Sequence, residues 1–345
     1  MAQSNQLQFG NLIDLANRDF GGKVLEASDD FFASKDNLIN PEEAFWDADR
    51  YTEDGKWMDG WESRRKRIEG HDWCVLELGM PGKISVVDID TAHFLGNHPP
   101  FASLEGALAP KDFDGNSFDK LDWVNLLETS ALGPGRHNYF GIENDVVVTH
   151  LRLNIFPDGG VARLRVFGKP VALDRPHEDD ARFAGQINEG AHDLVALRNG
   201  GKALACSDMF FGTMDKLLAP GRGHNMSSGW ETKRKREKGH DWVILQVGST
   251  GTLEHAVVDT QHFKGNPPAA FSIEGIYAPG LDILTLRESD EWRELMPRSE
   301  LKPHDEAIFA FPDDAKTMGV THIRFNIYPD GGVSRLRLFG RKAGV

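Results

Sequence analysis

One block of fourteen residues occurs twice, and this repetition constrains the fold more than any other feature of the chain. Residues 60–73 read GWESRRKRIEGHDW and residues 229–242 read GWETKRKREKGHDW, with ten of the fourteen positions identical. The copies lie about 170 residues apart, far beyond the roughly 20–50 residues of a solenoid unit. Each copy therefore belongs to a whole domain with its own core.

The length of the chain agrees with two domains. At 345 residues, each half is long enough to bury a core of its own. We predict one repeat in residues 1–172 and the other in residues 173–345. The linker between them is expected within residues 169–187, which hold two prolines and a run of acidic residues.

Composition bears on the partners and on the compartment. The formal net charge of −14 disfavours nucleic acid and anionic membranes, because both select basic surfaces. The first twenty residues do not resemble a signal peptide, and no apolar run approaches the ~18 residues of a membrane span. The two cysteines, Cys74 and Cys206, occupy non-equivalent positions in the repeats. We therefore expect a cytoplasmic protein without disulfides.

Short apolar runs separated by glycine, proline and asparagine predict an all-β chain. The predicted strands recur in both halves and cover residues 21–29, 73–79, 87–94 and 103–106, with counterparts at 200–208, 242–248, 257–263 and 272–275. The pairs Phe31-Phe32 and Phe210-Phe211 are expected to anchor the core. Residues 34–59 are expected to form a surface loop, and no structure is predicted for residues 110–140 and 279–318.

The end of each repeat carries the clearest local pattern. Residues 149–168 and 321–340 share fifteen of twenty positions, and in each an alternating run flanks Pro-Asp-Gly-Gly. This pattern predicts a β-hairpin. If Leu151 and its alternate neighbours face the core, then His150, Arg152 and Asn154 share the opposite face. Together the strands predict two tandem jelly-roll β-sandwiches.

The repeated block itself offers several polar groups, each open to two readings. In the run Arg64 to Arg67, alternate cations would face opposite ways on a strand, so one pair could line an anion pocket while the others are solvated. Glu62 and Glu231, beside tryptophans, could act as general acids or bases, or could pair with the following arginines.

Histidine and aspartate recur together at matched positions. His71-Asp72 and His240-Asp241 could relay protons. Asp90, His93, Asp259 and His262 could ligate a divalent metal such as Mn²⁺, although histidines at strand ends also serve as turn residues. The sequence does not favour metal binding over a structural role for these residues.

Taken together, these motifs resemble those of the allantoicase family. The resemblance rests on G-W-E-[ST]-x-R-K-R-x-x-G-H-D-W, the [AC]-S-D-x-F-F opening, D-T-x-H-F and R-x-N-I-[FY]-P-D-G-G-V-x-R-L-R-x-F-G, in order and in two copies. It implies hydrolysis of allantoate to ureidoglycolate and urea in allantoin and purine degradation. It also implies galactose-binding or discoidin-like jelly rolls and a homo-oligomer.

The implied substrate suggests roles for the repeated residues. Allantoate carries one carboxylate and two ureido groups, which call for guanidinium and carboxamide partners. The candidate substrate-binding residues are Arg65, Arg152, Asn154, Arg234, Arg324 and Asn326. The candidate catalytic residues are Glu62, His71, Asp72, Glu231, His240 and Asp241.

A second reading remains from a different class. Tandem discoidin-like sandwiches can bind ligands without catalysing a reaction. The many ionisable side chains repeated in both halves favour an enzyme over this alternative. Differences between the copies, such as Asp88 against Val257 and Asp59 against Ser228, leave open whether both repeats are active.

Overall fold

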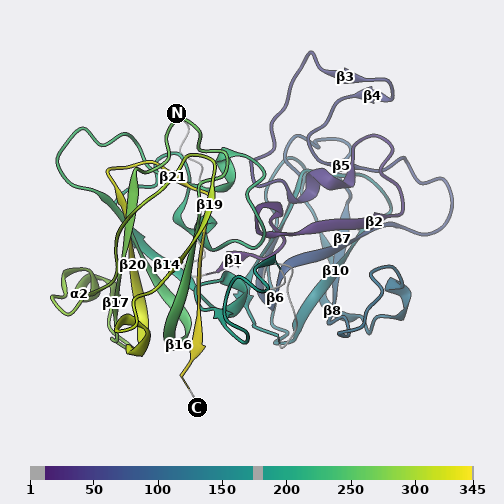
Figure 1. Ribbon diagram of the computed structural model, residues 1–345. Helices are drawn as coiled ribbons and strands as arrows, with labels where there is room; N and C mark the ends of the chain where they lie inside the picture. The colour runs from purple at the N-terminus through teal and green to yellow at the C-terminus, as the bar shows by residue number, and fades with distance from the viewer. Residues whose placement is uncertain (1–11, 174–181, 344–345) are drawn as a thin grey trace. The chain divides into compact units, whose positions relative to one another are not determined.

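The computed structural model describes residues 12–173 and 182–343. The chain divides into two compact units, residues 1–171 and 172–345, and each unit is built almost entirely of β-strands (Figure 1). The all-β prediction and the prediction of two β-sandwich domains are confirmed. The expected linker begins inside a strand, because residues up to Pro170 still pair within the first unit. Residues 174–181 of that linker lie outside the described part of the chain.

The first unit is organised around one long strand, β6 (Asp72–Asp90). Its first half pairs with β2 (Lys23–Ala27) and β10 (Val147–Phe156), and β10 continues the layer to β7 (Phe101–Ala107) and β8 (Val124–Ala131). Its second half pairs with β9 (Tyr139–Gly141) and β12 (Arg163–Pro170), and β12 also pairs with β1 (Ile13–Asp14). One strand thus contributes to both layers of the sandwich.

The second unit repeats this arrangement around β16 (Asp241–Asp259). The strands equivalent to those of the first unit are β14 (Lys202–Cys206), β20 (Val320–Tyr328), β17 (Ala270–Ile276), β18 (Arg293–Glu300), β19 (Glu306–Ala310), β22 (Arg335–Lys342) and β13 (His192–Asp193). The sequence prediction divided each long strand into two separate strands. The two predicted strands form one continuous strand, because the backbone stays extended where the chain passes from one layer to the other.

Short elements complete both units. The two-residue strands are β3 (Tyr51–Thr52), β4 (Gly55–Lys56), β5 (Trp61–Glu62), β11 (Gly160–Val161), β15 (Trp230–Glu231) and β21 (Gly332–Val333). The helical turns are η1 (Arg18–Phe20), η2 (Lys35–Ile39), η3 (Phe118–Lys120), η4 (Leu197–Asn199), η5 (Met214–Leu218), η6 (Met226–Ser228), η7 (Ala315–Thr317) and the α-helix α2 (Ile283–Glu288). The β3–β4 ribbon projects from the first unit, within the segment predicted to be a surface loop (Figure 1).

The predicted hairpin around Pro-Asp-Gly-Gly is wrong. The flanking strands β10 and β12 each pair with β6, but in different layers, so the turn carries the chain from one layer to the other. The turn is held by the repeated block: Lys66 N donates to Asp158 Oδ2 (2.8 Å), and Ser63 N donates to Gly159 O (3.2 Å). Local alternation marked both strands correctly but carried no information on which strand each one pairs with.

Two further expectations are corrected. The aromatic pairs are not core anchors, since Phe31, Phe210 and Phe211 are 47%, 69% and 60% exposed. The basic run after β5 is not a strand, so the alternation of its side chains has no structural basis. The core instead contains Trp61 and Trp230, both fully buried, and the alternate residues of β10.

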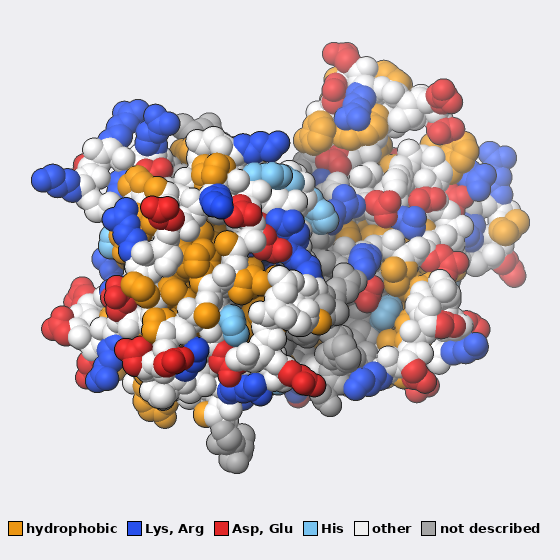
Figure 2. Space-filling model, in the orientation of Figure 1, with side chains coloured by type: hydrophobic (Ala, Val, Ile, Leu, Met, Phe, Trp, Pro, Cys, Tyr) orange, Lys and Arg blue, Asp and Glu red, His pale blue; other side chains and the backbone are white. Residues whose placement is uncertain are grey.

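The surface is charged but mixed in sign. On the face shown in Figure 2, lysine and arginine side chains are interspersed with aspartate and glutamate side chains. Among the described residues, no helix has the length and apolar character needed to cross a membrane.

The crossing of β6 between layers generates a prediction about stability. A Cβ atom on Gly79 would lie 2.1 Å from the backbone oxygen of Phe20, so Gly79→Ala must displace the turn that follows η1. We expect a loss of about 1–3 kcal/mol in the free energy of unfolding, measured by chemical denaturation. Gly141→Ala in β9 is the matched control, because nothing lies within 4 Å of its Cβ position. Equal stability of the two variants would contradict this account of the crossing.

Candidate functional site

A polar cluster forms on the outer face of the layer that contains β7 and β10. The strand register places Arg152 opposite Glu105 and Asn154 opposite Ser103. Asn154 Nδ2 donates to Glu105 Oε2 (3.0 Å) and to Ser103 Oγ (3.2 Å). The alternate residues Leu151, Leu153 and Ile155 are fully buried on the other face. The prediction that Arg152 and Asn154 share a face is therefore confirmed, and β7 completes the cluster.

His71 joins this cluster from the residue just before β6. Its Nε2 lies 3.2 Å from Asn154 Oδ1, and its ring lies 4.6 Å from the ring of Phe156. The carboxylate of Glu105 only accepts hydrogen bonds, so it fixes the amide of Asn154 with its oxygen toward His71. His71 must then donate through Nε2, which leaves Nδ1 of the neutral ring as a proton acceptor.

Arg152 borders the same cluster. Its Nη1 lies 3.6 Å from Glu105 Oε2, and its guanidinium stacks 4.4 Å from the ring centroid of Trp123. The side chain is only 27% exposed, and stacking on tryptophan holds its planar group in a fixed orientation. With His71 and Asn154 it lines a pocket of about 380 Å³. This volume lies within the roughly 300–1,000 Å³ of small-molecule sites.

His150 lies on the same face but outside this pocket. It is 5% exposed, and its Nδ1 lies 2.9 Å from Thr149 Oγ1. Phe113 and Phe118 from the segment before β8 pack against its ring. His322 of the second unit is buried in the same way, and burial lowers its pKa.

The second unit reproduces the cluster. The distances are 3.2 Å from His240 Nε2 to Asn326 Oδ1, 3.1 Å from Asn326 Nδ2 to Glu274 Oε2, 3.4 Å from Arg324 Nη1 to Glu274 Oε2, and 4.4 Å from Arg324 to the Trp292 ring. One substitution changes the surroundings. Tyr328 replaces Phe156, and its hydroxyl lies 2.9 Å from Ser272 Oγ. Each half therefore holds an imidazole, a carboxamide, a carboxylate and a guanidinium in the same geometry.

Asp72 does not meet His71, because neighbouring residues of an extended chain point to opposite faces. Its Oδ1 accepts from Ser28 Oγ (2.9 Å) and pairs with Lys66 Nζ (2.5 Å). Asp241 is bound in the same way by Ser207 (2.9 Å) and Lys235 (2.8 Å). The structure thus does not bring the His-Asp neighbours together as proton relays. Arg65 lies exposed in the loop after β5 and does not line the pocket of His71, and Arg234 is likewise exposed in the loop after β15.

Glu62 lines a second pocket of the first unit, of about 470 Å³, together with His93 and Asn97. Its Oε1 accepts from Asn97 Nδ2 (2.7 Å), and Asn266 binds Glu231 at the same distance. Burial raises the pKa of both glutamates, opposed by these hydrogen bonds. Neither forms an ion pair with the following arginines; Arg64 instead pairs with Asp29 at 2.6 Å. Glu62 and His71 therefore lie in different pockets.

The four residues considered for a metal are not assembled as one set. His93 Nε2 lies 3.1 Å from Ala44 O, and His262 Nε2 lies 2.8 Å from Gly223 O. Both histidines adopt positive φ, 70° and 72°, which suits the turn role. Asp259 accepts two hydrogen bonds of 2.9 Å from Arg222. Asp90 has different neighbours, described below.

Sequence reasoning missed Ser103, Glu105 and Trp123, which contact Asn154 or Arg152, and Asn97 of the Glu62 pocket. A signal was present for two of them. The motif Ser-x-Glu-Gly recurs at residues 103–106 and 272–275, and the period of two places its serine and glutamate on one face. The tryptophans carried no such signal, since they lie in the segments least similar between the repeats.

The fold and the cluster define a duplicated β-sandwich protein with a polar pocket lined by imidazole, carboxamide and guanidinium groups. A model described as the allantoicase repeat matches residues 13–171 and 192–343. Proteins named probable allantoicase from Photobacterium profundum and Pseudomonas fluorescens are each 47% identical, covering 98% and 96% of this chain and 98% and 97% of their own lengths. The crystal structure of allantoicase from Saccharomyces cerevisiae is 35% identical over 96% of this chain and 93% of its own, with a TM-score of 0.75. The chain belongs to the allantoicase family.

The raised pKa of Glu62 predicts a pH-dependent contribution to stability. Between the ordinary and the raised pKa, the folded state holds more protons than the unfolded state, so stability falls as pH rises. Glu62→Gln can still accept from Asn97 but cannot ionise. We expect the Tm of the variant relative to wild type to rise as the pH is increased from the ordinary range of a glutamate pKa through the raised pKa of Glu62. Glu69→Gln, at an exposed position, is the control for removing one carboxylate. A Tm difference that falls over this range would contradict the assignment.

Proposed function

We propose that this protein hydrolyses allantoate to ureidoglycolate and urea, and that the reaction takes place in the pocket of His71 and its counterpart at His240. Family membership supports the reaction, since the relatives compared above are named allantoicase. One structural observation carries the location. The His-Asn-Glu-Arg cluster recurs in both units with matching distances.

The cluster offers a partner for each part of the substrate. The guanidinium of Arg152, held flat on Trp123, is suited to two parallel hydrogen bonds with the allantoate carboxylate. Glu105 and Asn154 Oδ1 accept hydrogen bonds, which suits the N–H groups of a ureido arm, since both N–H bonds of Asn154 are already directed to Glu105 and Ser103. Both residues are held by the same short network, so they meet the substrate with little loss of side-chain entropy.

The reaction needs one proton to change place. A water O–H bond and one C–N bond break, the hydroxyl joins the central carbon, and the proton passes to the nitrogen of the departing urea. We assign this transfer to His71, whose Nε2–H donates to Asn154 while Nδ1 can accept the proton and return it. Positioned proton transfer of this kind contributes about 10²–10⁴-fold to a rate.

Substitution of the histidines tests both the reaction and its location. We expect the double variant His71→Gln/His240→Gln to lower kcat by about 10²–10⁴-fold, with urea release from allantoate as the measurement. The single variants divide the activity between the repeats: comparable losses of about half mean two working sites, whereas an unequal split identifies the working copy.

The second pocket supplies the contrasting variant. Glu62→Gln/Glu231→Gln should retain kcat within a few fold if the reaction occurs beside His71. Full activity of the histidine double variant together with loss in the glutamate double variant would move the proposed centre to the Glu62 pocket. Absence of urea release by the wild-type protein would remove the proposed function itself.

The arginines give an independent prediction about binding. Arg152→Lys/Arg324→Lys keeps the charge but loses the planar pair of donors and the stacking on tryptophan. We expect KM to rise by about tenfold or more, the change that about 1.4 kcal/mol produces, with a smaller effect on kcat. An unchanged KM would mean that the carboxylate is bound elsewhere.

We also propose that the protein acts in the cytoplasm as a homo-oligomer. The two cysteines support a reducing compartment, since both are free and Cys74 is buried. The resemblance to the family is the basis for the oligomer. The exposed pair Phe210-Phe211 is apolar surface of the type that subunit contacts cover.

A further inference from the structure

We propose that the first repeat binds a divalent transition-metal ion between Glu43, Asp90 and His137, at the position where the second repeat places the guanidinium of Arg222. This site is separate from the His71 pocket, and the inference does not rest on the proposed reaction. It involves Asp90, one of the candidates from the sequence, but replaces His93 with two residues that no motif indicated.

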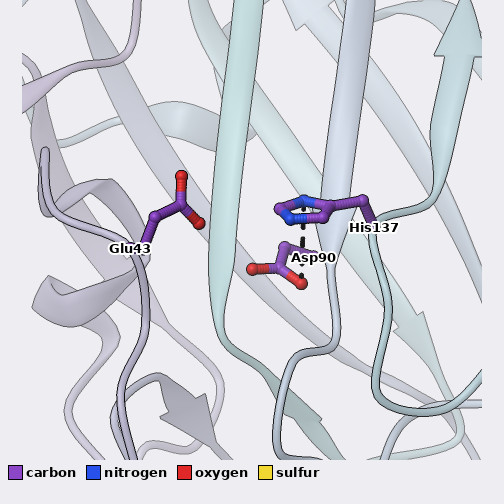
Figure 3. Close-up of side chains that lie close together, drawn as sticks. All are labelled: Glu43, Asp90 and His137. Carbon is purple, nitrogen blue, oxygen red and sulfur yellow. Dashed lines mark ion pairs between the residues drawn. The ribbon is translucent and has the colours of Figure 1, made fainter. Parts of the chain in front are cut away.

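The three side chains converge from separate parts of the first unit (Figure 3). Asp90 ends β6, Glu43 lies in the loop after η2, and His137 precedes β9. One potential ligand atom from each lies within 4.8 Å of the others. Three ligands around a single ion with bonds of about 2.0–2.2 Å lie roughly 3.3–3.8 Å apart. Side-chain movements of about 1 Å would therefore close the site.

Asp90 has a buried carboxylate oxygen that lacks a hydrogen-bond partner within the described residues. Its side chain is 1% exposed, and its Oδ2 has no hydrogen-bond partner within the described residues. Oδ1 accepts from the backbone N–H of Ala92 (2.8 Å) and lies 3.9 Å from His137 Nδ1. In Figure 3 the other carboxylate oxygen points toward Glu43. A buried carboxylate oxygen without a partner is costly unless a cation or a donor meets it.

A third carboxylate supports the histidine. Asp88 Oδ2 lies 2.7 Å from His137 Nδ1, and Asp88 Oδ1 accepts from the backbone N–H of Asn138 (3.1 Å). Metal-binding histidines commonly carry such a carboxylate partner, which fixes the ring and increases its basicity. Asp88 is 2% exposed, so it is held in place independently of any ion.

The second repeat shows what this position requires. The fourth residue after η2 is Glu43, and the fourth residue after the equivalent η5 is Arg222. Arg136 O accepts from Thr91 N, and Asp305 O accepts from Thr260 N, so the following residues His137 and Glu306 are also equivalent. The second repeat therefore has Arg222 where the first has Glu43, and Glu306 where the first has His137.

In the second repeat, Arg222 provides the positive charge that pairs with the buried Asp259. Arg222 binds both oxygens of Asp259 at 2.9 Å and lies 3.9 Å from Glu306. The buried aspartate that ends the long strand is thus neutralised by a cation of the same chain. In the first repeat the equivalent aspartate faces Glu43 and His137, and a bound cation would do what the guanidinium of Arg222 does.

One arginine of the first repeat lies near Asp90, but it is already paired. Arg163 is the nearby arginine that favours the charged form of Asp90, but its Nη2 is already 2.8 Å from Asp59 Oδ2.

The loop that carries Glu43 is held in place before any ion binds. Arg163 Nε donates to Glu42 O (2.9 Å), and Arg165 Nη2 donates to Pro41 O (3.1 Å) and Glu42 O (3.0 Å). Both arginines are almost fully buried. Glu43 is therefore presented toward Asp90 by a fixed backbone, as a ligand site requires.

The ligand types define the class of metal. Two carboxylates with one imidazole suit Mn²⁺, Fe²⁺ or Zn²⁺ better than Ca²⁺ or Mg²⁺, which prefer oxygen alone. Glu43 and His137 are exposed while Asp90 is buried, so the ion would be open to water on one side. Chelators should therefore remove it.

Direct binding of Mn²⁺ tests the proposal without reference to activity. The full chain is freed of metal by a chelator and titrated with Mn²⁺, and the signal of free Mn²⁺ is followed by electron paramagnetic resonance. Titration with Zn²⁺, followed by a chromophoric competitor, accompanies it. We expect one ion per chain, with at least tenfold weaker binding in Asp90→Asn. Asp259→Asn in the second repeat is the matched control and should bind as wild type does.

A charge exchange separates loss of the site from loss of the fold. Glu43→Arg/His137→Glu gives the first repeat the residues of the second, so it should abolish metal binding and keep a folded protein with a Tm that no longer responds to metal. Arg222→Glu/Glu306→His makes the reverse exchange and should add a second, weaker ion. The proposal is overturned if neither Mn²⁺ nor Zn²⁺ binds wild type, or if Asp90→Asn binds as wild type does.

Discussion

The antiparallel pairing of β6 with four other strands is the constraint on which the first unit depends, and β16 plays the same part in the second. Because one continuous strand belongs to both layers, the layers cannot slide relative to each other without breaking a ladder. His71 enters one pocket immediately before this strand begins, and the end of the strand carries Asp88 and Asp90 into a second polar cluster. The two ends of one element thus position chemistry on different parts of the unit.

The sequence predicted those features that depend on repetition and on period. Duplication predicted two domains, and alternation predicted that Arg152 and Asn154 share a face, which their common partner Glu105 confirms. It could not predict the partner strands, because pairing depends on contacts between residues far apart in the chain. For that reason the segment around Pro157 was mistaken for a hairpin, and β7 was not recognised as part of the site.

The two repeats keep one cluster and change another. The His-Asn-Glu-Arg set has nearly the same distances in both units, whereas the position beside the terminal aspartate of the long strand has reversed its charge from Glu43 to Arg222. This charge reversal could not be recognised from the sequence alone, because the segments that carry Glu43 and Arg222 differ in length and are dissimilar. The structure aligns the two repeats at this position, because η2 is equivalent to η5 and the backbone hydrogen bond of Thr91 is equivalent to that of Thr260.

The buried arginines of β12 also bear on how the chain acquires its shape during synthesis. Arg163 and Arg165 hold the carbonyl groups of residues 40–42, which precede them by more than 120 positions. A ribosome that releases the chain from its N-terminus must therefore expose that loop long before its anchors emerge. Closing such distant contacts is slow, so the first repeat must wait for its last strand, and cotranslational chaperones would meet the early strands unpaired.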